Sequence, residues 1–421
     1  MRTEEYDVAI VGGGPAGSNA ARLLKEYDSS LDVVLFERGA EPTANCAGGL
    51  GLPFPYHLGI TPPEHVVKSY IREVTLSSPN HEVQVSLDDI QAKGPEWMDE
   101  SVDKMGWIVD RQAWDNWQLE QAEKAGVDVR TKHTVHEVEN QVPRRTVRLR
   151  VQDRDENKEF GVRVDACGLA CGPSWDLAIQ AGFEEEEVVP PKSEQHMGVQ
   201  HHMKDPDYME EYGPGNIYLR FDTRYAPGGY VWSFPEGDGY TRWGNGVPLD
   251  REGAASDYLD KFLTDEGKMQ YKETARQHTM SIIPTAKPLS SCVNGSVGLI
   301  GDTGHHCDPL HGGGMMFGSR AGKAFAQAVV RDELALYDEI WKDDFLHVLQ
   351  HRFVIRDLLY NMDNEEIDRF IASMEGFDVN SFNPDTEIPR LLWHCLRKDS
   401  GIFTKSAAQA TRSVVKQRLG M

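Results

Sequence analysis

The sequence predicts an α/β protein with a Rossmann-like domain interleaved with an antiparallel-sheet domain, plus a mainly helical C-terminal region. Three observations support this prediction: a strand–glycine–helix–strand unit near the N-terminus, a second glycine-rich helix start far along the chain, and alternating strand-like segments between them. We expect the first domain in residues 1–68, 101–185 and 291–330, the antiparallel sheet in 69–100 and 186–290, and the helical region in 331–421.

The N-terminal unit has the pattern of a dinucleotide-binding turn. Asp7–Val11 predicts a short buried strand and Ser18–Lys25 a helix, joined by Gly12, Gly14 and Gly17. This glycine spacing allows a tight turn, lets a pyrophosphate approach the backbone, and lets the helix pack on the strand. The helix N-terminus offers unpaired N–H groups to the pyrophosphate.

An acidic residue completes the unit. Asp32–Phe36 predicts a second strand, and Glu37 follows it at the place where a carboxylate takes ribose hydroxyls. Together these features predict dinucleotide binding, and the alternative is an ordinary glycine-rich turn between a strand and a helix.

A second glycine-rich region indicates which dinucleotide. Ser296–Asp302 predicts a buried strand ending in Gly-Asp, followed by a loop through Gly312–Gly314 and a helix from Met315. We expect this second helix start to converge on the same ligand, with Asp302 taking a ribityl hydroxyl. A nicotinamide dinucleotide needs no such distant second half-site, whereas a flavin dinucleotide does, so FAD is the predicted cofactor. The alternative is a parallel strand that simply ends in a Gly-Asp turn.

Composition narrows the class of protein. The net charge of −23 argues against simple nucleic-acid binding. The start, MRTEEYD, lacks the apolar segment of a signal peptide, and six irregularly spaced cysteines are typical of reduced thiols. We therefore expect a cytoplasmic protein without a spanning helix and without a metal site.

The motifs together resemble a known family. Gly12–Gly17 with Glu37 and Arg38, Gly106–Arg111 (GWIVDR), and Gly301-Asp302 before Pro309–Gly314 resemble the glutathione-reductase-type FAD fold of aromatic hydroxylases. Within that fold, Pro227–Pro235 (PGGYVWSFP) is similar to the PxxYxWxFP signature of the geranylgeranyl reductase family. The resemblance implies that the following residues bind FAD: Gly12, Gly14, Ala16, Gly17, Glu37, Arg38, Cys46, Ala47, Gly49, Arg111, Val135, Asp302, Gly313, Gly314 and Met315.

The signature strand carries three rings at alternate positions. Tyr230, Trp232 and Phe234 therefore lie on one face of the strand, and Trp243–Val247 is its expected partner. The plain alternative is a core strand packed on its neighbour. The resemblance implies instead a catalytic-site wall in which Tyr230 and Trp232 contact an apolar prenyl chain.

Two further residues are candidates for a catalytic role. Cys46 aligns with a family cysteine near the flavin ring, although Ala47 stands where glycine is common; its thiol could act in redox chemistry or simply pack against the ring. His306 follows Asp302 in the loop expected beneath the flavin, where it could donate a proton or stabilise reduced flavin; the alternative is a polar loop residue.

The resemblance implies an FAD-dependent reductase that saturates double bonds of geranylgeranyl chains in isoprenoid lipids or their precursors, with hydride from flavin N5. Only one dinucleotide fingerprint is present, so the reductant is either NAD(P)H docking transiently or an electron-carrier protein such as reduced ferredoxin. The alternatives are a flavin-dependent monooxygenase or halogenase on the same fold, and a non-catalytic electron-transfer or lipid-binding flavoprotein. The basic segment 397–419 predicts a peripheral contact with anionic membranes, and the alternative is a basic helix that pairs with the protein's own acidic surface.

Overall fold

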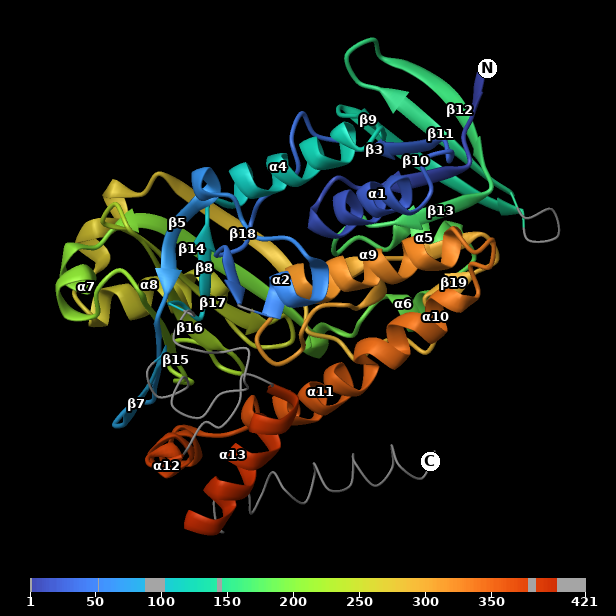
Figure 1. The fold of residues 1–421 in the computed structure, drawn as a ribbon. Helices are drawn as coiled ribbons and strands as arrows, with labels where there is room; N and C mark the ends of the chain where they lie inside the picture. The colour runs from blue at the N-terminus through green and yellow to red at the C-terminus, as the bar shows by residue number, and fades with distance from the viewer. Residues whose placement is uncertain (1, 52, 88–102, 142–145, 378–383, 400–421) are drawn as a thin grey trace. The chain divides into compact units, whose positions relative to one another are not determined.

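The computed structural model describes residues 2–51, 53–87, 103–141, 146–377 and 384–399, and the chain forms two compact units. Unit 1 comprises residues 1–44, 111–195 and 283–353, and unit 2 comprises 45–110, 196–282 and 354–421. Each unit is thus assembled from three segments, which Figure 1 traces by colour. The chain first leaves unit 1 after Ala44, earlier than the residue 68 expected from the sequence.

The centre of unit 1 is a six-stranded sheet whose main strands run parallel. The buried runs VAIV and VVLF form adjacent strands because their β-branched and apolar side chains are covered on both faces. In sheet order the strands are β19 (Val293–Asn294), β20 (Val297–Leu299), β13 (Ala166–Leu169), β2 (Val8–Val11), β3 (Val33–Phe36) and β9 (Asp128–Arg130).

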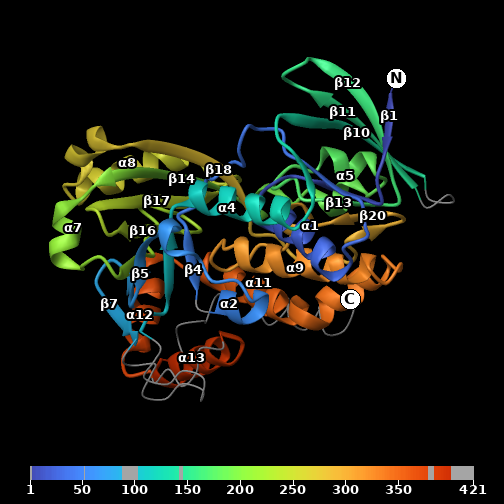
Figure 2. The same cartoon turned by 45° about the horizontal axis from the view of Figure 1, so that its top comes forward.

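Helices α1 (Pro15–Tyr27) and α9 (Met315–Val329) pack closely against each other in this unit (Figures 1 and 2). Small residues permit the approach: a Cβ on Gly322 would lie 2.6 Å from the Ala16 carbonyl oxygen. The Asn19 amide also donates to the Ser319 carbonyl at 2.8 Å. As a result, the N-termini of the two helices start side by side.

A second, four-stranded sheet in unit 1 has the order β1-β12-β11-β10. Its strands β11 and β12 form an antiparallel pair. The bounds are β1 (Thr3–Glu5), β10 (His133–Gln141), β11 (Thr146–Asp153) and β12 (Lys158–Val164), and the other helices of the unit are α4 (Arg111–Lys124), α5 (Asp176–Gln180), α6 (Glu185–Val188) and α10 (Leu336–Trp341). Helix α11 (His347–Leu359) begins in unit 1 and ends in unit 2.

Unit 2 is built on a seven-stranded sheet, mainly antiparallel as predicted. In sheet order its strands are β18 (Gln277–Pro284), β14 (Gln195–Lys204), β17 (Tyr240–Pro248), β16 (Tyr230–Glu236), β15 (Asn216–Arg220), β6 (Glu73–Ser77) and β7 (Glu82–Ser86). A smaller sheet holds β4 (Gly49–Gly51), β8 (Gly106–Val109) and β5 (Val67–Ile71), and the helices are α2 (Pro53–Leu58), α7 (Pro206–Glu211), α8 (Ala255–Asp265), α12 (Asn364–Met374) and α13 (Pro384–Lys398).

The two faces of the large sheet differ in what covers them. Val231 and Trp243 point to one face, where they pack with Leu259 and Phe262 of α8 in a hydrophobic core. Tyr230 and the other signature rings alternate with these residues and so point to the opposite face. We call this opposite side the aromatic face.

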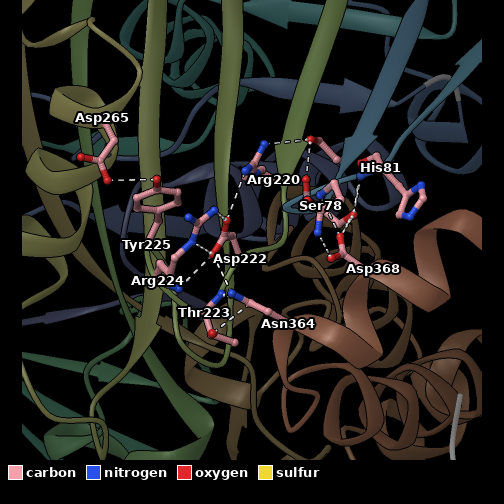
Figure 3. Close-up of polar contacts among 12 residues, drawn as sticks. Ser78, His81, Arg220, Asp222, Thr223, Arg224, Tyr225, Asp265, Asn364 and Asp368 are labelled. Atoms are coloured by element: carbon pink, nitrogen blue, oxygen red, sulfur yellow. Dashed lines mark hydrogen bonds and ion pairs between the residues drawn. The ribbon is translucent and has the colours of Figure 1, made fainter.

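Helix α12 is fastened to two loops of the large sheet by polar contacts (Figure 3). At its first residue, the Asn364 side-chain oxygen accepts from the Thr223 backbone N–H, while its amide nitrogen donates to Asp222. One turn later, the Asp368 carboxylate accepts from the Ser78 hydroxyl at 2.6 Å. The two contacts fix which side of α12 faces the sheet.

Over the residues that the structure describes, no helix combines the length and the apolar character needed to cross a membrane.

Candidate functional site

In unit 1 the first glycine turn is held by backbone contacts. Gly12 has φ of +110°, and a Cβ there would lie 2.1 Å from the Ala170 carbonyl oxygen. A Cβ on Gly17 would lie 2.0 Å from the Gly12 carbonyl oxygen. In contrast, a Cβ on Gly14, the residue preceding α1, would meet nothing within 4 Å. The turn is therefore closed on its protein side and open at the helix N-terminus, where an anion binds best.

Glu37 lies next to this turn and is only 6% exposed. Its carboxylate accepts from the backbone N–H of Gly13 at 2.8 Å and of Gly39 at 2.7 Å. The side chain thus joins the glycine turn to the loop after β3. A carboxylate has about four acceptor positions, so hydroxyls of a ligand can still bind.

The second half-site surrounds Asp302. The preceding strand β20 ends at Leu299, and Asp302 lies in a 3₁₀ turn, Gly301–Gly304, not at the strand end predicted. Its Oδ1 lies 2.7 Å from where a Cβ on Gly314 would be, beside the first residue of α9. No described residue donates a hydrogen bond to this carboxylate, and burial raises its pKa to about 6 despite the charge of Arg111.

Arg111 begins helix α4, and its guanidinium pairs with Asp115 one turn later. Nη2 lies 2.9 and 2.6 Å from the two carboxylate oxygens, and Asp115 is fully buried. Burial raises the pKa of Asp115, and Arg111 opposes that shift. The sequence analysis missed Asp115, although the i,i+4 spacing from Arg111 is the signal that could have identified it.

His306 lies in the loop that follows the 3₁₀ turn Gly301–Gly304. Its ring is fully buried, with centroids 4.9 Å from Trp341 and 5.7 Å from Phe345, and Nε2 is 3.5 Å from the Cys292 sulfur. Burial lowers the pKa of His306 to about 3, so the imidazole is neutral at physiological pH. The proton-donor role expected for His306 stays a prediction, which would have to be fulfilled by a neutral and buried imidazole.

The remaining predicted cofactor residues are placed as follows. Val135 is buried in the core of unit 1 beside a bulge in β10, whereas Arg38 is exposed. Ala16 packs under Gly318 between α1 and α9. Gly313 and Gly314 precede α9, which starts at Met315 as predicted.

In unit 2, the aromatic strand pairs with a glycine-containing strand. Tyr230 is opposite Gly246 and Trp232 is opposite Gly244, so the predicted partner strand around Trp243–Val247 is confirmed. A Cβ on Gly244 would lie 2.5 Å from the Trp232 ring, which means that the indole lies directly over this glycine. Gly244 and Gly246 stand at alternate positions of β17, and this spacing in the sequence could have predicted the packing of a ring over the strand.

The loop that contains Cys46 lies on the same aromatic face. Gln200 Nε2 donates to the Asn45 carbonyl at 3.2 Å, and Arg242 Nη1 donates to the Cys46 carbonyl at 3.1 Å. Just beyond Ala47, a Cβ on Gly49 would lie 2.6 Å from the ring of Phe234. Two buried side chains therefore hold consecutive carbonyls and leave the Cys46 side chain exposed.

A buried charge network supports this loop. Arg242 Nε donates to Glu236 Oε1 at 2.8 Å, and His202 Nε2 lies 3.0 Å from Glu236 Oε2. Glu236 is fully buried. Burial alone would raise the pKa of its carboxyl, but the hydrogen bond from His202 and the charge of Arg242 outweigh that effect and hold the pKa below its usual value. The positive charge of Arg242 is thus matched within the protein.

Two segments of the chain match known protein families. Residues 194–283 match the model described as the geranylgeranyl reductase catalytic domain, and residues 10–49 match one described as an NAD(P)-binding Rossmann-like domain. Over residues 194–283 the chain is therefore similar to the geranylgeranyl reductase family. The family segment contains both the aromatic strand and the strand with Gly244.

Relatives and solved structures agree with this assignment. Digeranylgeranylglycerophospholipid reductase 2 of Methanothermobacter thermautotrophicus is 26% identical over 396 residues, covering 90% of this chain and 94% of the relative. The Methanoculleus marisnigri digeranylgeranylglycerophospholipid reductase is 26% identical over 397 residues, covering 90% and 92%.

Among solved structures, a geranylgeranyl bacteriochlorophyll reductase-like protein from Thermoplasma acidophilum has a TM-score of 0.83 at 20% identity, covering 97% of this chain and all of that one. The p-nitrophenol 4-monooxygenase of Pseudomonas putida has a TM-score of 0.64 at 14% identity, covering 94% of this chain and 98% of its own. At these identities the likeness is one of fold.

Proposed function

We propose that this protein is an FAD-dependent reductase that saturates carbon–carbon double bonds of geranylgeranyl chains in isoprenoid lipids or their precursors. The observation that carries the proposal is the signature strand, whose rings lie on one sheet face together with the Cys46 loop. The names of the relatives support a prenyl phospholipid as the substrate class.

The residues of unit 1 fit FAD. The open helix start at Gly14 suits its pyrophosphate, and Glu37 suits the adenosine ribose. Asp302, a carboxylate without a hydrogen-bond donor among the described residues, suits hydroxyls of the ribityl chain. Bound FAD, once reduced, would supply a hydride to one alkene carbon, and the Cys46 thiol or a water would supply the proton to the other, while the protein binds and orients the chain.

The residues of unit 2 suit an apolar substrate. The ring centroids of Tyr230 and Trp232 are 5.9 Å apart, and both side chains lie on the aromatic face. Each such ring buries roughly 150–250 Å², which favours a hydrocarbon chain over a polar metabolite. The role of these side chains is to position a double bond and to exclude water; the Cys46 thiol is proposed to lie at the reacting end of this surface.

A direct test is anaerobic incubation of dithionite-reduced holoprotein with a geranylgeranyl-ether phospholipid, followed by mass spectrometry of the lipid. We expect a gain of two hydrogen atoms per reduced bond. An unchanged lipid in this incubation, together with hydroxylation or halogenation of a substrate in a separate aerobic incubation, would favour the monooxygenase or halogenase alternative. A reducible flavin with no turnover at all would favour the non-catalytic alternative.

The physiological reductant is either NAD(P)H, docking transiently, or a carrier such as reduced ferredoxin. Stopped-flow measurement of flavin bleaching with each donor separates them, since only the competent donor reduces the flavin within the turnover time.

We also propose a peripheral membrane contact through the basic segment 397–419, most of which lies outside the described residues. Deleting residues 404–421 should reduce co-sedimentation with anionic liposomes in a salt-sensitive way. A truncated protein that keeps its FAD and sediments as before would contradict this contact.

A further inference from the structure

The strip of the aromatic face around Gly244 contains two buried polar atoms without hydrogen-bond partners. One is the indole Nε1 of Trp232, which is 8% exposed, and the other is the amide Oε1 of Gln200, which is 5% exposed. Neither atom is within hydrogen-bond range of any group in the part of the chain that the structure describes. Buried polar groups are nearly always paired, so a nearby donor and acceptor that both lack partners point to a bound molecule.

Sheet register places both groups on one face and on either side of Gly244. Gln200 of β14 and Trp232 of β16 are each directly opposite Gly244 of β17. Residues opposite one another across neighbouring strands project to the same side. The indole nitrogen itself would be 2.6 Å from a Cβ on Gly244, so it lies over the side-chain-free position between the two residues.

The orientation of the Gln200 amide is fixed by its other contact. Its Nε2 donates to the Asn45 carbonyl at 3.2 Å, and a carbonyl can only accept. Turning the amide over would place two oxygens against each other, so Oε1 is the amide atom that is left without a partner.

The chemistry of the strip selects a neutral group. It offers one donor and one acceptor, and Arg242, two residues before Gly244 on β17, is already paired with Glu236. Leu219 of β15, the strand on the other edge of β16, is directly opposite Trp232 and is apolar. A phosphate or carboxylate would find no unmatched positive charge there, whereas a hydroxyl can accept from the indole and donate to the amide.

We propose that Trp232 and Gln200, the two residues opposite Gly244, form a subsite that holds a single hydroxyl group on the aromatic face. The hydroxyl belongs either to water or to an alcohol at the end of the prenyl ligand. Only the identification of the alcohol as a prenyl alcohol rests on the proposed function. Binding of a hydroxyl by Trp232 and Gln200 does not require that the protein reduces any substrate.

The test measures binding to oxidised, FAD-loaded protein, so that no reaction occurs. Three probes are titrated by calorimetry: geranylgeraniol, its methyl ether, and the hydrocarbon that lacks the oxygen. The ether accepts from Trp232 but cannot donate to Gln200, so the series separates the two contacts. The variants are Trp232→Phe, which removes the N–H and keeps a ring, and Gln200→Leu. Trp175→Phe is the matched control, because it removes another buried indole nitrogen in unit 1.

If the hydroxyl is the ligand's own, wild-type protein should bind the alcohol about 3- to 10-fold more tightly than the ether, the usual worth of one hydrogen bond. Gln200→Leu should abolish that preference, Trp232→Phe should abolish the preference of ether over hydrocarbon, and Trp175→Phe should change neither. If the occupant is water, the three probes should bind equally, and a crystal structure should show an ordered water within hydrogen-bond distance of both atoms that disappears in Trp232→Phe.

Equal binding of the probes together with no ordered water between the two groups would overturn the subsite. That result would leave the proposed reductase standing if the mass gain of the lipid is still observed. Conversely, a hydroxyl preference that depends on both residues would support the subsite even in a protein that reduces no prenyl chain.

Discussion

The two glycine clusters of this chain differ in what the missing side chain makes room for. In unit 1, Gly12 and Gly17 bring backbone against backbone, while Gly14 leaves open space at a helix start. In unit 2, Gly244 makes room for the indole of a neighbouring strand. The missing side chain therefore permits backbone contact at Gly12 and Gly17, leaves open space at Gly14, and makes room for a side chain at Gly244. The spacing of glycines in the sequence alone does not distinguish these three roles.

The largest effect is expected at the closed part of the first cluster. A Cβ from Gly17→Ala would lie 2.0 Å from the Gly12 carbonyl oxygen, and Gly12 is itself held against Ala170, so neither backbone can retreat. We expect a loss of about 3 kcal/mol or more in unfolding free energy, at the upper end for overpacking. Urea unfolding measures it.

Gly14→Ala is the matched control, because its Cβ meets nothing within 4 Å. Its unfolding free energy without FAD should stay near wild type, while FAD affinity falls. Equal destabilisation by the two variants would show that the cluster is not divided between fold and ligand.

The next largest effect is expected at Asp302, the buried carboxylate beside Gly314 in unit 1. Its pKa in the folded protein is raised by burial to about 6, so the protonated acid is the form that the FAD-free fold prefers. The associated stability is complete below the unfolded pKa near 4 and is lost as pH rises through about 6. Relative to Asp302→Asn, FAD-free wild type should be equally stable at acid pH and less stable by roughly 2–3 kcal/mol at neutral pH. Chemical unfolding of both proteins across this range measures the difference, and parallel pH curves would refute it.

Gly244→Ala tests the second cluster. Its Cβ would lie 2.5 Å from the Trp232 ring, so the indole must turn away, at a cost of about 1–2 kcal/mol. FAD content should be unchanged, and near-ultraviolet circular dichroism should report the altered tryptophan. Gly246→Ala is the control, since its Cβ would lie 3.6 Å from the same ring, an ordinary contact. A loss of FAD with Gly244→Ala would contradict the separation of roles.

The smallest effect lies away from both clusters, in the polar attachment of α12. Asn364→Ala removes hydrogen bonds to Thr223 and Asp222 and should cost about 1 kcal/mol, most visible as faster amide exchange in α12. Asn361→Ala serves as the control. Among the described residues, its amide donates to the Asp357 carbonyl at 2.7 Å and accepts a long contact from Arg251 at 3.5 Å, so it does not attach α12 to the large sheet. Equal exchange in the two variants would show that the attachment does not hold the helix.

Local patterns predicted much of this molecule. The strands at Val8–Val11 and Val33–Phe36, the helix start at Met315, and the three rings on one face all follow from periodicity and glycine spacing over a few residues. Periodicity suffices there because each element buries the face that its own sequence marks as apolar.

Features that depend on distant partners were not predictable in this way. His306 enters the core because Trp341 and Phe345, far along the chain, enclose its ring. The orphan Gln200 oxygen exists because the Asn45 carbonyl occupies the amide's other end. In both cases the contacting residues are far apart in the sequence, so a local sequence pattern could not predict the contact.

The sheet of unit 1 also dictates how the chain must be made. Strand β13 pairs with β2 on one side and with β20 on the other, and β20 spans Val297–Leu299. While a ribosome is still adding the second segment of unit 2, residues 196–282, one edge of β13 has no neighbour. An unpaired apolar strand edge is a template for wrong pairing and aggregation. Nascent chains of this protein therefore pass through a long interval in which a chaperone or the ribosome surface must shield β13, and expression should fail first where translation pauses before residue 297.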